Sequence, residues 1–60
     1  MNSRQLDEMR KALDKATTAL GVAGEAAALG NSKDVERALK EAAEELAKCR
    51  EVLKALESES

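Results

Sequence analysis

The sequence predicts an all-α fold: an antiparallel two-helix hairpin that assembles with other copies into a multi-helix bundle or ring. Ala, Glu, Lys, Leu and Arg make up 39 of the 60 residues, and the chain has no Pro and no aromatic residue. This composition is typical of long helices and coiled coils. The apolar residues recur at intervals of three and four, as they do along one side of a helix, and one Gly-Asn-Ser segment at 30–32 interrupts the pattern.

The first helix is predicted over about residues 3–29, with Asn2 or Ser3 as its N-cap. Its apolar residues form an unbroken heptad stripe. A second row of small residues, Ala12, Ala19 and Ala26, repeats every seventh position beside that stripe and would let a neighbouring helix approach closely. The members of the stripe are Leu6, Met9, Leu13, Ala16, Leu20, Ala23 and Ala27.

Gly30 is predicted to end the first helix, because glycine readily adopts the left-handed conformation at a helix C-terminus. The turn occupies about residues 30–32, and Asn31 or Ser32 caps a second helix over about 33–57, within one domain of 1–60. So short a connection places the two helices side by side and antiparallel. The second stripe is Val35, Leu39, Ala42, Leu46, Cys49, Leu53 and Leu56.

A single hairpin has few large apolar side chains with which to form a hydrophobic core. Only thirteen side chains, those of eight Leu, three Val and two Met, bury a large apolar area. Two helices that touch along one seam leave each apolar stripe half exposed to water. We therefore expect a marginal monomer whose stripes are completed by further helices.

The second half of the first helix is nearly free of charge on all sides, which is typical of helices buried on more than one side. Val22 and Leu29 lie seven residues apart, with Ala26 on a neighbouring row, and we expect this patch to contact another chain. Gly21 and Gly24 each cost about 0.8–1 kcal/mol relative to Ala inside a helix. Close approach of another backbone is the favoured explanation; a tolerated weakness, or a hinge or ligand gap, remain the alternatives.

The residues needed for most chemistry are missing. The chain has no His, a single Cys, and no glycine-rich loop followed by Lys-Ser or Lys-Thr, which argues against an enzyme, a metal site within one chain and any cofactor. Glu41, Glu44 and Glu45 are expected on a solvated outer face. A net charge of −2 with both signs interleaved, and no aromatic residue, argues against nucleic-acid binding.

No membrane or secreted class fits the pattern. The least charged segment, 16–30, is too short to span a bilayer, and the chain opens on charged helix without a signal peptide. A soluble protein in a reducing, cytoplasmic compartment is expected. Cys49 is interpreted as a small buried hydrophobe, with an intersubunit disulfide or a shared metal site as the alternatives.

The segment Gly30-Asn31-Ser32-Lys33-Asp34-Val35-Glu36-Arg37-Ala38-Leu39-Lys40 resembles the loop-and-restart segments of de novo designed helical repeats and bundles. The following Glu41-Ala42-Ala43-Glu44-Glu45-Leu46-Ala47-Lys48 has the same regularity of caps, heptads and charges. The resemblance implies symmetric self-assembly or scaffolding, with no biological substrate.

Self-association into a homo-oligomeric bundle is therefore the predicted function, with the chain itself as partner. The alternative is a small binding module or chaperone-like subunit that folds against a larger helical protein; a ligand or metal host formed between subunits is a third reading. The residues predicted for the core or interface are Leu6, Met9, Leu13, Leu20, Val22, Ala23, Ala26, Leu29, Val35, Leu39, Leu46, Cys49, Leu53 and Leu56.

Overall fold

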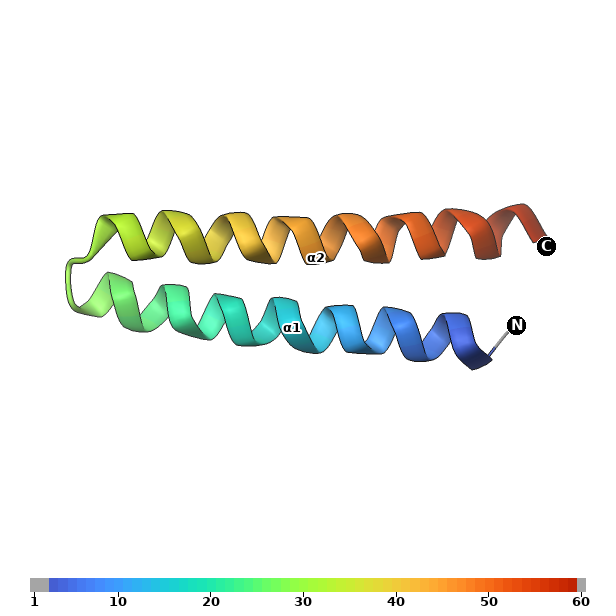
Figure 1. Cartoon of the computed structure of the whole chain (residues 1–60), viewed down its shortest axis with the longest axis horizontal. Coiled ribbons are helices and arrows are strands. Elements are labelled where there is room, and N and C mark those ends of the chain that lie inside the picture. Colours follow the sequence, from blue (N-terminus) through green and yellow to red (C-terminus); the bar gives the residue numbers. More distant parts are fainter. Residues whose placement is uncertain (1–2, 60) are drawn as a thin grey trace.

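The computed structural model describes residues 3–59, without the side chain of Glu59. It contains helix α1, Ser3–Ala28, and helix α2, Ser32–Glu59. The two helices pack side by side and antiparallel, so that the start of α1 and the end of α2 lie together at the end opposite the turn (Figure 1). The predicted all-α hairpin is therefore confirmed. Helix α2 begins one residue before its predicted start and runs two residues beyond its predicted end, while Asn2 lies outside the described residues.

The turn closes by the hydrogen bonds of a Schellman motif. The Gly30 N–H donates to the carbonyl of Ala27 at 3.0 Å, and the Asn31 N–H donates to the carbonyl of Ala26 at 2.9 Å. Gly30 has a φ of 74°, which a residue with a Cβ adopts only at a steric cost. The predicted glycine stop is thus present, and it satisfies carbonyls that the end of α1 leaves without partners.

Asn31 caps helix α2. Its Oδ1 accepts a hydrogen bond from the Asp34 N–H at 3.2 Å, while its Nδ2 donates to Asp34 Oδ2 at 2.7 Å. The Asn31 carbonyl accepts the first hydrogen bond of the helix, from the Val35 N–H at 3.1 Å. Of the two predicted caps, Asn31 is the one used, and Asp34 lies in the first turn, where the helix dipole favours a negative charge.

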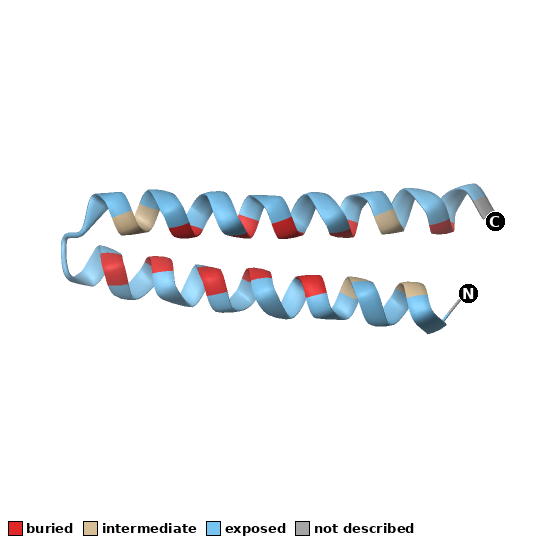
Figure 2. Ribbon diagram, in the orientation of Figure 1, coloured by how far each residue is buried: buried red, intermediate tan, exposed pale blue. Residues whose placement is uncertain are grey.

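The seam between the helices is made mainly of alanine. Buried residues on each helix face the other helix along the hairpin (Figure 2). The small-residue row expected beside the first stripe therefore lies in the seam together with the alanines of that stripe, and every leucine of the two stripes except Leu56 lies outside it. The cause is steric, because small side chains repeated on both helices let the backbones pack closely while a leucine row does not. The buried residues are Ala12, Ala16, Ala19, Ala23, Ala26, Ala38, Ala42, Glu45, Cys49 and Leu56.

The resulting molecule is a thin rod. Its Cα atoms extend over 45 × 15 × 10 Å, with a radius of gyration of 13.9 Å. A compact domain of this length has a radius of gyration of about 10 Å. The hairpin therefore has two long flanks beside its seam, and its side chains differ between them.

Candidate interaction surface

Six leucines remain accessible along the rod. On α1 they are Leu6, Leu13 and Leu20, which are 41%, 44% and 50% exposed. On α2 they are Leu39, Leu46 and Leu53, which are 49%, 42% and 48% exposed. The seven-residue spacing aligns each set of three in one row along its helix. We call these six residues the leucine face.

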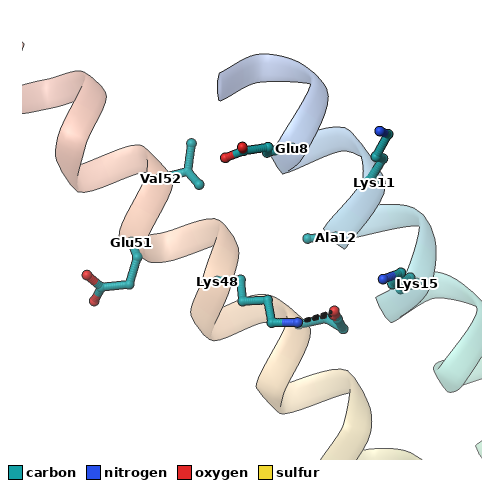
Figure 3. Close-up of a pocket in the computed structure, with 8 residues that line it drawn as sticks. Glu8, Lys11, Ala12, Lys15, Lys48, Glu51 and Val52 are labelled. Atoms are coloured by element: carbon teal, nitrogen blue, oxygen red, sulfur yellow. Dashed lines mark hydrogen bonds and ion pairs between the residues drawn. The ribbon is translucent and has the colours of Figure 1, made fainter. Parts of the chain in front are cut away.

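The charged side chains show that both leucine rows lie on the same flank. Two pockets of about 450 and 300 Å³ combine residues from α1 and α2; the first is lined largely by Lys and Glu, the second is half charged, and neither has a leucine among its lining residues. Lys15 of α1 and Lys48 of α2 line the larger of them (Figure 3). Because these charged rows from both helices meet beside one edge of the seam, the leucine rows, on the other side of the buried residues of each helix, meet beside the other edge. We call the flank lined by Glu8, Lys11, Lys15, Glu41, Lys48 and Glu51 the charged face.

Glu45 is the clearest departure from the sequence prediction. It was expected on a solvated face, but its side chain is only 8% exposed in the seam, where the Lys48 ammonium lies 3.1 Å from Oε1. The ammonium is also 3.3 Å from Oε2, so it donates to both oxygens. The signal was present in the spacing, because Glu45 is three residues after Ala42 and four before Cys49, both buried. Because Glu45 is charged, its position in the seam was not recognised from the sequence.

The other predicted core and interface residues divide into three groups. Ala23, Ala26, Cys49 and Leu56 are buried within the hairpin. Met9 and Val35 are half-buried at the seam. Val22 and Leu29 are 50% and 85% exposed, on the row that begins at Glu8 and Lys15 along the charged face.

The patch predicted from Val22, Ala26 and Leu29 is therefore divided. Ala26 is buried against α2, so only Val22 and Leu29 remain available to another molecule. Both lie on the opposite side of the seam from the leucine face. The two apolar surfaces of the hairpin thus differ in extent, because one runs along both helices and the other is limited to α1 near the turn.

The polar residues in the middle of α1 need no partner from another helix. Thr17 Oγ1 donates to the carbonyl of Leu13 at 2.9 Å, and Thr18 Oγ1 donates to the carbonyl of Asp14 at 3.0 Å. Apart from the adjoining residues and backbone of its own helix, a Cβ added to Gly21 or Gly24 would meet no atom of the described chain within 4 Å. The packing of the hairpin itself therefore does not require either glycine.

Cys49 lies buried in the seam as a free thiol, and its Sγ donates to the carbonyl of Met9 at 3.6 Å. Residues 3–59 contain no group of three or more His, Cys, Asp or Glu side chains arranged to hold a metal ion. Within the same residues, neither helix is both long enough and apolar enough to cross a bilayer. The exposed leucines are thus the feature of this chain with the clearest capacity for binding.

No protein-family model, curated protein or solved structure matches this chain. The exposed surfaces of the hairpin are therefore the features that indicate a function.

Proposed function

We propose that this chain is a self-associating helical hairpin that forms a symmetric homo-oligomeric helical bundle through its leucine face. The observation that carries the proposal is the arrangement of six leucines, each between 41% and 50% exposed, along one flank of an alanine seam. Monomeric proteins rarely expose a continuous apolar patch of this kind. Its role is structural, as a scaffold or assembly unit, in keeping with the resemblance to designed bundles.

The free energy available from the leucine face is large for so small a protein. Burying a leucine side chain completely contributes about 1.5–3 kcal/mol, so burying the exposed half of six side chains contributes about 5–9 kcal/mol per hairpin before the cost of association. The alanines of the seam contribute much less per residue. Association is therefore the step that gives the leucines their stabilising effect.

The positions of the apolar residues in each heptad also support helices as the partners of the leucine face. Apolar residues at two seam positions plus one flanking position of each heptad are the pattern of helices in bundles rather than of a two-stranded coil. In this chain the flanking position is leucine on both helices, so each hairpin presents a flat surface two helices wide. A surface of the same shape and chemistry exists on every other copy.

The first test replaces one leucine on each helix with glutamate. We expect the double variant Leu13→Glu/Leu46→Glu to be monomeric at concentrations where the wild-type chain is an oligomer, because association would bury two carboxylates per copy without partners. Lys40→Glu is the matched control, since it changes the net charge by the same −2 at an exposed position. Native mass spectrometry in reducing buffer at several micromolar suits a chain that has neither Trp nor Tyr.

Two results would overturn the proposal. The first is a wild-type chain that remains monomeric and helical through this concentration range. The second is a double variant that assembles as the wild type does, which would remove the leucine face from the contact. A wild-type chain that is unfolded alone and folds on adding a larger helical protein would support the alternative function, a binding module.

A further inference from the structure

We propose that the leucine face binds one second copy of this chain, so that two hairpins stack face to face in a closed, two-fold symmetric four-helix bundle. This inference rests on the proposed function and adds the number of copies and the geometry of contact. Three observations carry it: the excess surface of the hairpin, the charged residues that border the leucine face, and the chemistry of the opposite flank.

The excess surface matches one contact. The hairpin exposes 4778 Å², whereas a compact monomeric protein of its mass, 6.4 kDa, exposes about 3,800 Å². The difference of about 1,000 Å² is close to the about 800 Å² that each partner buries in a standard protein–protein interface. One face-to-face contact therefore brings the surface near the expected value, whereas a ring needs two contacts per hairpin.

The border of the leucine face favours two copies over three or more. Arg10 lies four residues after Leu6, and Arg50 lies four residues after Leu46, so each arginine sits on the outer side of its leucine row. Both arginines are exposed. When two flat faces stack, these outer edges stay in water. When three or more hairpins converge on one axis, the edges of neighbouring hairpins meet and the guanidinium groups lose water.

The charged face explains why the assembly closes. A two-fold contact uses the same patch on both copies, so neither copy has a leucine face left for a third, and the second apolar surface is limited to Val22 and Leu29 near the turn. The outward flanks then present the Lys and Glu side chains of the charged face to solvent. Such a surface keeps assemblies apart and soluble.

Native mass spectrometry combined with small-angle X-ray scattering of the wild-type chain tests the geometry. We expect twice the chain mass, together with a maximum dimension close to that of one hairpin, whose Cα atoms extend over 45 Å. A trimer or larger species would overturn this inference and leave the proposed function standing. A dimer nearly twice as long as one hairpin would also overturn it, because the contact would then be end to end through the turn. A folded monomer would overturn both proposals.

A second variant tests the border independently of the mass. We expect Arg10→Ala/Arg50→Ala to change the dimer dissociation constant by less than about threefold, as is typical for groups that remain hydrated at the rim of an interface. Sedimentation velocity with interference optics measures this constant. A weakening of more than about tenfold would place the two arginines inside the contact and overturn the face-to-face geometry.

Discussion

The leucine face and the charged face border the same alanine seam and are built from the same two helices, but they have opposite relations to water. The charged face satisfies its own groups, since Lys48 pairs with Glu45 and the neighbouring side chains are solvated. The leucine face has no such compensation, and its six side chains are each about half exposed. Under the proposed function, the seam holds the hairpin in shape while the leucine flank determines what the hairpin binds.

The sharpest test of this comparison uses two residues of equal exposure. Leu20 and Val22 lie two residues apart on α1 and are both 50% exposed, but they lie on opposite flanks. We expect Leu20→Glu to raise the dissociation constant of the assembly at least about a hundredfold, about 2.7 kcal/mol, because each copy would bury a carboxylate. Val22→Glu should change it by less than about threefold, as measured by sedimentation velocity.

The pair is a matched control, because both substitutions add one negative charge to the same helix. Equal weakening by the two variants would show that both flanks contact other copies. That result would restore the contact role predicted from the sequence for the patch of Val22 and Leu29. A larger increase in the dissociation constant for Val22→Glu than for Leu20→Glu would show that the charged face makes the main contact.

The sequence was sufficient to predict the hairpin, because its strongest signals are local. The Gly30 stop and the helix cap depend on a few neighbouring residues; the stop appears as predicted, and Asn31 is the one of the two predicted caps that is used. Which row of residues forms the seam was harder to predict from the sequence. Leu13 and Ala12 are adjacent in the chain, and either row continues a heptad pattern with Ala16 and Ala23, so periodicity alone does not say which one faces the second helix.

The choice between these rows depends on packing between the helices. Five buried alanines on α1 and two on α2 permit close approach of the helices, and six of the leucines then lie on the flank. Hydrophobicity favours leucine for the seam of an isolated chain, so the preference for alanine is understandable only if the leucines have another use. Glu45 was missed for a related reason, since its charge outweighed its spacing in the prediction.

A second prediction concerns the buried carboxylate of Glu45 at the edge of the charged face. Lys48→Met keeps the apolar stem of the lysine but removes the ammonium that lies 3.1 Å from Glu45 Oε1. We expect the free energy of unfolding to fall by about 1 kcal/mol, a modest value because Lys48 is itself mostly exposed. Thermal unfolding followed by circular dichroism, at one fixed chain concentration, measures the change.

Glu45→Ala provides the complementary variant. It extends the alanine seam, so in the Lys48→Met background it should recover the lost stability by removing the unpaired carboxylate. If Lys48→Met alone has no effect on unfolding, the carboxylate of Glu45 is solvated in solution. The charged face would then contribute nothing to the stability of the hairpin.

The smallest expected effect separates the two glycines of α1. Gly21 points away from both faces, whereas Gly24 lies four residues after Leu20, beside the leucine face. Both have open space where a Cβ would lie. Gly21→Ala should therefore stabilise the hairpin by about 0.8–1 kcal/mol and leave the dissociation constant unchanged.

Gly24→Ala should give the same gain in helix stability but weaken association by about threefold to tenfold, because a docked copy approaches the backbone at this position and the added methyl group crowds it. Unfolding and sedimentation measurements on the same two samples separate these contributions. An unchanged dissociation constant for Gly24→Ala would mean that the glycine is only a tolerated weakness of the helix. An increased dissociation constant for Gly24→Ala, with no change for Gly21→Ala, would show that the leucine face and Gly24 form one contact surface.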